Sequence, residues 1–188
     1  AFTGHGFQVH AGHNKPSSRG HVRAVSGDIS QHPEIQFNYL ATAEDREGFR
    51  NCVHLTREIM RQPAMDQFRG EVIQPTDDVQ SDEQIDTFIR QSVDSAYHPS
   101  CTCKMGTDAM AVVDPELKVQ GLNNIRVIDS SIFPTIPNGN LNAPTMMVAE
   151  RGADLIKGNV INASIPVKVY IDECWPERQK EGLAIRVL

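Results

Sequence analysis

The sequence lacks long apolar runs, clustered positive charge and a signal-like start, and each absence excludes a class of protein. No window approaches the roughly 18 consecutive apolar residues of a membrane-spanning helix, so any membrane association is expected to be peripheral. Lys and Arg number 18 against 24 Asp and Glu, for a net charge of −6. Because a phosphate-binding surface needs clustered cations, nucleic acid is not an expected partner. The start lacks the charged and then apolar segments of a signal peptide.

Phosphate-binding loops and a disulfide framework are also absent. Neither GxGxxG nor a GxxxxGKS/T motif follows a predicted strand and opens a helix, so the main binding loop of any nucleotide cofactor is expected outside this chain. The four cysteines do not have the spacing of a small disulfide-rich secreted domain, which favours a reducing compartment. What remains, 188 residues with 39% hydrophobic content, is enough to bury a core.

Three segments have the composition of β-strands or turns. Residues 20–40 alternate in part between apolar and polar side chains on both sides of Pro33, which predicts two strands joined by a turn. Residues 96–119 predict short strands and turns, because Pro and Gly interrupt them. Ile125–Ile128 is a short apolar run typical of a strand buried on both faces of a parallel sheet.

Two segments begin with capping boxes. "TAED" at 42–45 predicts the start of a helix that ends before Pro63. "SDEQ" at 81–84 predicts the start of a second helix. Helical spacing predicts the apolar face of each. The predicted faces are Phe49, Val53, Thr56, Ile59 and Met60 in the first helix, and Ile85, Phe88, Ile89 and Val93 in the second.

A third helix follows the polar loop "PNGNLN" at 137–142. Pro144 lies near its first position and Gly158 is its expected C-cap. Its predicted apolar face is Met147, Val148, Leu155 and Ile156. A buried strand, a polar loop and a helix together predict half of a nucleotide-binding unit, because ligands of open α/β sheets bind at the carboxyl ends of strands and helix N-termini favour negative charge.

The stretch "AYHPSCTCKMG" at 96–106 allows several chemical interpretations. Cys101 and Cys103 are one residue apart, with His98 three residues upstream. Zinc sites use wider cysteine spacing and a second ligand pair, and redox pairs are usually CxxC. Two thiols that pack as small hydrophobes are favoured over either. His98 is either structural or catalytic on this evidence.

Several segments, in this order and spacing, resemble the C-terminal part of the glucose-methanol-choline (GMC) oxidoreductases: "AYHPSCTCKMG", "DPELKVQGLNNIRVIDSSIFP" and "GNLNAPTMMVAERGADLIKG". "SRGHVRAVSGDISQHPEIQFNYL" and "REIMRQPAMDQFRGEVIQP" narrow the resemblance to the choline-oxidising members. The resemblance covers about residues 5–160. It implies that the chain is a C-terminal fragment of a longer protein whose N-terminal part carries the missing dinucleotide motif, and that the fragment alone is inactive with little affinity for FAD.

The resemblance implies an α+β fold, with an antiparallel substrate-domain sheet and helices plus the last strand and helix of a Rossmann-type FAD domain. Residues 1–95 would belong to the substrate-binding domain. Residues 96–160 would hold the active-site segment and the C-terminal part of the FAD-binding domain. Residues 161–188 would form an extended tail.

The activity that the resemblance implies is FAD-dependent oxidation of choline to betaine aldehyde, and onward to glycine betaine, by hydride transfer to the flavin. One alternative is a GMC dehydrogenase for another small, uncharged alcohol. An alternative of a different class is a non-catalytic metal-binding or interaction module, although no metal site is expected. The implied partners are the remaining N-terminal part and a quinone-type membrane electron acceptor. The expected location is the cytoplasmic side of the bacterial inner membrane, with the mitochondrial inner membrane as the alternative.

Individual site residues are implied in the same way. His98 in "YHP" matches the family's catalytic histidine, and Asn140 in "GNLNA" matches its His or Asn partner across the alcohol oxygen. Tyr97 fits one wall of an aromatic cage for a quaternary ammonium. The implied cofactor-binding residues are Asp129, Ser130, Asn140, Asn142, Ala143 and Thr145.

Each of the three catalytic or substrate-binding assignments has a structural alternative. His98 would then be a structural histidine, Asn140 a turn former and Tyr97 a core aromatic. One position also departs from the family pattern, because many members have Gly where this chain has Cys101. The role of Cys101 therefore stays open.

Overall fold

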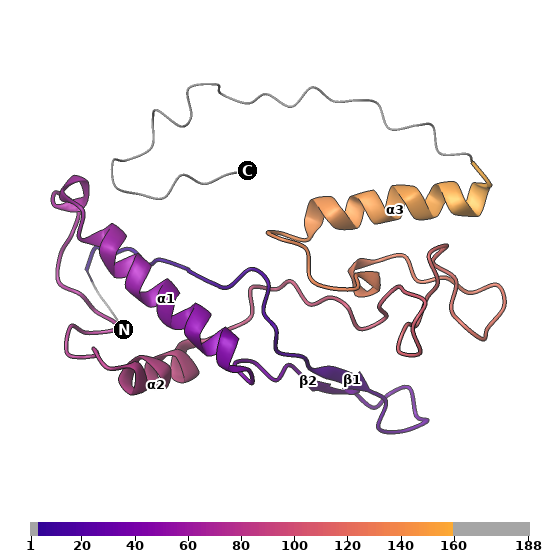
Figure 1. The fold of residues 1–188 in the computed structure, drawn as a ribbon, viewed down its shortest axis with the longest axis horizontal. Coiled ribbons are helices and arrows are strands. Elements are labelled where there is room, and N and C mark those ends of the chain that lie inside the picture. The colour runs from indigo at the N-terminus through magenta and orange to yellow at the C-terminus, as the bar shows by residue number, and fades with distance from the viewer. Residues whose placement is uncertain (1–3, 160–188) are drawn as a thin grey trace.

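The computed structural model describes residues 4–159, so the predicted tail at 161–188 lies outside the described residues. The elements are β1 (His21–Arg23), β2 (Glu34–Gln36), α1 (Ala43–Met60), α2 (Asp82–Ser92) and α3 (Asn142–Lys157), with the 3₁₀ turns η1 (Pro63–Met65) and η2 (Ser130–Ile132). In Figure 1, α1 and α2 lie together at one end of the described chain, and α3 lies at the other end above the irregular segment that precedes it. The β1–β2 hairpin lies between them in this view.

The two strands predicted on either side of Pro33 are confirmed. β1 and β2 pair antiparallel, with Val22 opposite Ile35, and form a two-stranded sheet. Each strand has only three residues, and all six are exposed. A lone two-stranded hairpin is marginally stable in water, so this sheet gains little from its own burial.

The first two helices are confirmed at their predicted starts. Ser81 and Gln84 form the full capping box at the start of α2. α1 has only half of one, because Thr42 Oγ1 accepts the N–H of Asp45 (3.2 Å) but Asp45 turns its carboxylate elsewhere. Ile85 and Ile89 are buried as predicted, whereas the prediction was wrong for Ile59 of α1, which is exposed.

Asp45 is a buried carboxylate, 1% exposed, that holds an N-terminal segment against the start of α1. It accepts hydrogen bonds from the backbone N–H groups of Ser17 (2.7 Å) and Ser18 (2.9 Å) and from Ser17 Oγ (3.1 Å). Burial alone would raise the pKa of Asp45. The hydrogen bonds from Ser18 and Ser17 outweigh burial and lower its pKa from 3.8 to about 2.

A hydrophobic core forms in the second half of the described chain. It consists of Val113, Leu117, Ile132, Phe133, Leu141 and Val148. The members come from the irregular segment, from η2 and its C-cap, and from the N-cap and the second turn of α3. Of the short strands and turns predicted over 96–119, the turns are present here, and in place of strands the segment makes isolated bridges such as Met105–Val113. This core therefore joins the segments that carry the predicted site residues.

The strand predicted over Ile125–Ile128 is not formed. The segment makes one isolated bridge, from Arg126 to Lys118, and Ile125 is 48% exposed rather than buried on both faces. An apolar run needs neighbouring strands on both sides to become a buried parallel strand. The described residues place no strand beside it.

A small residue lets α3 pack closely against the segment before η2. Val148 and Gly152 are its buried positions, and an ideal Cβ at Gly152 would overlap Cγ2 of Ile128 and lie 2.8 Å from its Cδ1. The predicted apolar face was therefore partly wrong, because Met147 and Ile156 are exposed. Gly158 ends the helix in the left-handed conformation (φ 71°), as predicted.

Gly152→Ala should destabilise the protein. Alanine is favoured over glycine within a helix by about 1 kcal/mol, but overpacking against Ile128 costs about 1–3 kcal/mol. The measurement is the free energy of unfolding in urea. In an Ile128→Ala background, which empties the space, the same substitution should become neutral or stabilising. Stabilisation by Gly152→Ala in the wild-type background would contradict the close packing.

The stability that Asp45 contributes should depend on pH. Its folded-state pKa of about 2 lies below the unfolded value of 3.8, so the contribution is full above about pH 4 and is lost as the pH falls toward 2. A lowering of this size corresponds to about 2 kcal/mol. The unfolding free energies of wild type and Asp45→Asn should therefore converge toward pH 2. Glu44→Gln, an exposed neighbour in the same turn, is the control, and a pH-independent difference at Asp45 would refute the assignment.

Candidate active site

Backbone hydrogen bonds hold the segment that follows the predicted catalytic histidine against η2. Cys101 N–H donates to Ser130 O (3.3 Å), Cys103 N–H to Ser131 O (2.9 Å) and Met105 N–H to Ile132 O (2.7 Å). The "HPSCTCKM" segment and the segment predicted to contact the cofactor therefore run side by side. About thirty residues separate them in the sequence, which no local pattern indicates.

Two residues in the left-handed region bracket the predicted catalytic histidine. Tyr97 has φ 59° and Cys101 has φ 71°. Left-handed backbone is unfavourable for residues with a Cβ, and glycine adopts it readily. The conformation of residue 101 explains why a glycine suits this position in the family that the sequence resembles.

The structure places Tyr97 and His98 differently. Tyr97 is 82% exposed, so the described residues do not bury its ring. His98 is half-buried. Side-chain hydrogen bonds around it join Tyr97 N–H to Ser95 Oγ (3.0 Å) and Ser100 Oγ to Cys101 Sγ (3.3 Å), and the imidazole takes part in neither. The catalytic role of His98 stays a prediction.

In the predicted cofactor segment, Asp129 and Ser130 act structurally through groups that sequence reasoning did not assign. The carboxylate of Asp129 accepts the N–H of Ser131 (2.8 Å) and so caps η2. The carbonyl of Ser130 accepts the N–H of Cys101. The Ser130 hydroxyl and the remaining backbone amides of this turn are the groups left for a ligand.

The start of α3 has no side-chain cap. Leu141 occupies the N-cap position and is buried, while Asn140, Asn142 and Ala143 are exposed beside it. Thr145 Oγ1 donates to the Leu141 carbonyl (2.7 Å), so this hydroxyl supports the helix. The first N–H groups of an α-helix have no partner within the helix and attract negative charge.

The predicted site segments converge on one core. Cys101 packs against the core cluster that contains Ile132 from η2 and Leu141 from the start of α3. No hydrogen bond joins His98 to Asn140 among the described residues. The structure thus brings the three segments together, while the direct pairing of His98 with Asn140 stays a prediction.

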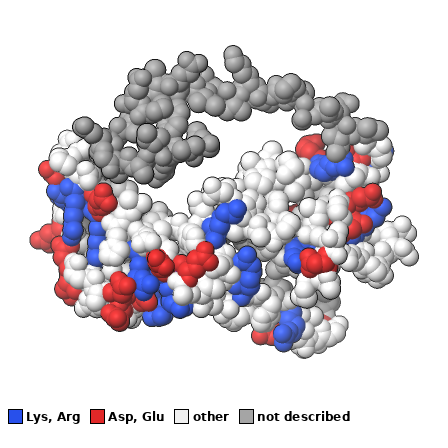
Figure 2. Space-filling view, in the orientation of Figure 1, with Lys and Arg blue, Asp and Glu red and all other residues white. Residues whose placement is uncertain are grey.

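The cysteines of this region are free thiols in the structure. Within residues 4–159, no group of three His, Cys, Asp or Glu side chains is placed to hold a metal ion. Nor does any helix in this range combine the length and apolar content needed to cross a membrane. On the face in Figure 2, positive and negative side chains are intermixed over α1 and α2.

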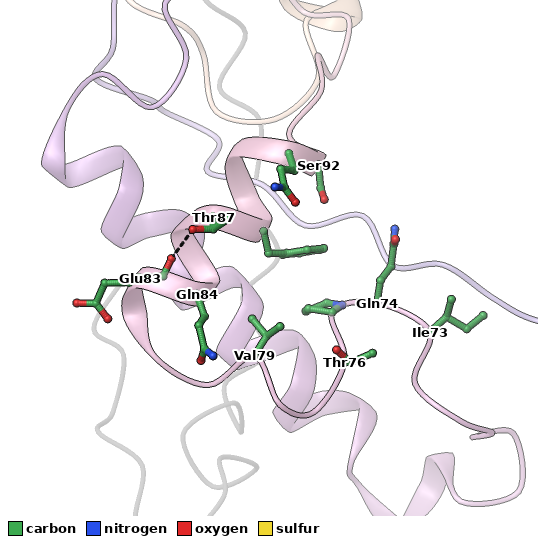
Figure 3. Close-up of a pocket in the computed structure, with 11 residues that line it drawn as sticks. Ile73, Gln74, Thr76, Val79, Glu83, Gln84, Thr87 and Ser92 are labelled. Carbon is green, nitrogen blue, oxygen red and sulfur yellow. Dashed lines mark hydrogen bonds between the residues drawn. The ribbon is translucent and has the colours of Figure 1, made fainter.

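A surface hollow lies away from these residues. It is an open groove of about 510 Å³ between the 73–79 loop and α2. Figure 3 shows Val79 beside the groove, with Thr87 of α2 donating to the carbonyl of Glu83. None of the predicted site residues lines this groove. Nothing in the sequence pattern indicated it.

The chain matches known proteins over most of its length. A family model described as GMC oxidoreductase matches residues 16–149. A protein of Photobacterium profundum named oxygen-dependent choline dehydrogenase is 55% identical over 188 residues, covering 99% of this chain and 33% of the relative. A protein of the same name from Vibrio vulnificus is 56% identical and is covered to 34%. The chain thus spans about a third of the length of these relatives.

Solved structures agree in fold. Pyridoxine 4-oxidase from Mesorbium loti superposes with a TM-score of 0.73 at 34% identity, over 79% of this chain and 29% of the other. An FAD-dependent oxidoreductase from Chaetomium thermophilum gives a TM-score of 0.74 at 32% identity, over 78% of this chain and 26% of the other. Both likenesses cover only part of the larger proteins.

Proposed function

This chain belongs to the GMC oxidoreductases, and we propose that it is the C-terminal third of an FAD-dependent enzyme that oxidises choline to betaine aldehyde and onward to glycine betaine. The observation that carries the proposal is the 55% identity over the whole chain with a protein named choline dehydrogenase. The convergence of the three predicted site segments on one core supports it.

The residues at the start of α3 fit a flavin. Asn142 and Ala143 are exposed residues at a helix terminus that no side chain caps, and Pro144 has no N–H to donate. Such a terminus stabilises an electron-rich carbonyl edge. Asn142, Ala143 and Thr145 would hold the cofactor from this side, and Asp129 and Ser130 from the η2 side. FAD, when bound, supplies the hydride acceptor.

His98 would act on the alcohol hydroxyl. Removal of a hydride from the carbon is favoured when the hydroxyl proton leaves, so a base or hydrogen-bond acceptor must lie beside that oxygen. The half-buried imidazole, unused in the bonds of its own turn, is available for this role. Asn140 is exposed in the loop before α3 and would donate its amide to the same oxygen.

Tyr97 would contribute to choline recognition. A quaternary ammonium cannot donate a hydrogen bond, so aromatic faces and a carboxylate must hold it. At 82% exposure, the Tyr97 ring is free for such contact. The other walls of the cage would come from the N-terminal part of the protein.

Exposed apolar surface supports that N-terminal part as a partner. More large hydrophobic side chains are exposed than buried in the described chain. Met146, Met147 and Ile156 on α3 are examples, each about 60% exposed, and large hydrophobic side chains exposed in such numbers are expected where another part of a protein covers them. Under this proposal residues 1–95 are part of a substrate-binding domain, and 96–160 hold the active-site segment and the C-terminal part of an FAD-binding domain.

The proposed electron acceptor is a membrane quinone, with the protein bound peripherally at the cytoplasmic face of a bacterial inner membrane. The relatives' name points to oxygen as the competing acceptor. A mitochondrial inner membrane is the alternative location.

Choline should bleach the flavin of the complete protein, meaning this chain joined to the N-terminal part, in the absence of oxygen. His98→Ala and Asn140→Ala should each slow that reduction on the order of a hundredfold or more, because each removes a group positioned at the reacting oxygen. Stopped-flow absorbance measures the rate. His54→Ala on the exposed side of α1 and Asn123→Ala are the matched controls.

Substrate class is tested in the same assay with the neutral isostere of choline, in which a tert-butyl group replaces the trimethylammonium. Choline should reduce the flavin faster at equal concentration. Equal rates would favour the alternative, an enzyme for uncharged alcohols. Wild-type rates in both site variants would make His98 structural and Asn140 a turn former.

The acceptor is tested separately. Flavin reduced by choline should be reoxidised faster by a soluble quinone analogue than by dissolved oxygen, and the protein should sediment with membranes and be released by high salt or mild detergent. Faster reoxidation by oxygen, with the protein in the soluble fraction, would reject the membrane acceptor without affecting the proposal for choline.

A further inference from the structure

The turn that carries His98 has little conformational freedom. Tyr97 and Cys101 are both in the left-handed region, and Pro99 has a fixed φ. A residue before proline is also confined to extended backbone, which restricts His98 itself. The orientation of His98 is therefore set largely by where the turn is anchored.

Cys101 is the anchor nearest to His98. Its N–H donates to the carbonyl of Ser130 (3.3 Å), which is the first bond between this turn and η2. Its side chain packs against the core cluster, and Sγ lies 3.3 Å from Ser100 Oγ. Cys101 therefore makes all three interactions: the backbone hydrogen bond to η2, the contact with the core and the contact with Ser100.

The Cβ of Cys101 further reduces the range of backbone conformations open to the turn. Glycine populates left-handed and right-handed backbone about equally, whereas a residue with a Cβ has only a small allowed left-handed region. Once core packing selects that region, a cysteine cannot move to neighbouring conformations as a glycine can. Cysteine at this position introduces some backbone strain but leaves the turn with fewer accessible conformations.

We propose that Cys101 is a positioning residue, which fixes the His98 turn against the Ser130 carbonyl and so sets where the imidazole lies relative to the flavin-contact segment. This inference rests on the proposed function for its effect on catalysis. The ordering of the turn does not depend on the substrate.

The test compares Cys101→Gly and Cys101→Ala in the complete, FAD-loaded protein. Cys101→Gly should slow flavin reduction at saturating choline by on the order of ten- to a hundredfold, the range that a small misplacement of a reacting group produces. Cys101→Ala keeps the Cβ and should retain more of the rate. Flavin content, the choline dissociation constant and the unfolding midpoint should stay within error of wild type.

Hydrogen exchange gives a readout independent of choline. Peptides spanning residues 96–106 should exchange faster in Cys101→Gly than in wild type. Cys103→Ala is the matched control, because the Cys103 N–H also donates to η2, at the carbonyl of Ser131, but Cys103 is not in the left-handed region. This variant should change neither the rate of flavin reduction nor the hydrogen exchange.

Unchanged exchange and reduction in Cys101→Gly would overturn the proposal. Equally damaging would be a loss of flavin or of stability in step with the rate, since that is the signature of a purely structural residue. If choline fails to reduce even the wild-type flavin, the proposed function fails. The exchange comparison still decides the positioning role in that case.

Discussion

The three backbone hydrogen bonds between residues 101–105 and η2 are the interaction on which the candidate site depends. Each contributes about 1 kcal/mol net, which is modest. Their effect is geometric, because they fasten an irregular segment, with no helix or strand of its own, to a turn that is capped by Asp129 and buried through Ile132. The backbone at Cys101, where the His98 turn ends, is thereby held against η2.

A core of six side chains supports these bonds. Ile132 and Phe133 extend it from η2, and Leu141 extends it to the start of α3. Gly152 lets α3 approach Ile128, just before η2, closely, and α3 and η2 are in contact. The start of α3 and the segment that follows His98 therefore pack against the same core, although no hydrogen bond links the two among the described residues.

Local signals predicted local structure well. Thr42 and Ser81 predicted the starts of α1 and α2, because the hydrogen bonds of an N-cap join residues only three apart in the sequence. The prediction of a strand at Ile125–Ile128 was wrong, because an apolar run indicates a tendency to be buried but not which strands are available to pair with it. The use of Asp45 by Ser17 and Ser18 was missed for the same reason: it joins segments almost thirty residues apart.

The candidate site residues were predicted from family resemblance, and the structure adds contacts that the resemblance does not contain. Periodicity gave no sign that residue 101 is left-handed, and the glycine of other family members was the one available clue. Nor could composition predict that Asp129 is used for capping and Ser130 for its carbonyl. The roles of these residues depend on contacts across the chain, which a pattern along the chain does not record.

The exposure of Tyr97 and the rigidity of the turn behind it have a common explanation in the proposed enzyme. A site assembled from two parts of a protein needs each part to present its groups in a fixed position before they meet, because ordering them afterwards would cost conformational entropy. This chain orders the backbone around His98 by its own hydrogen bonds and core. It leaves the ring of Tyr97 exposed and the start of α3 without a side-chain cap.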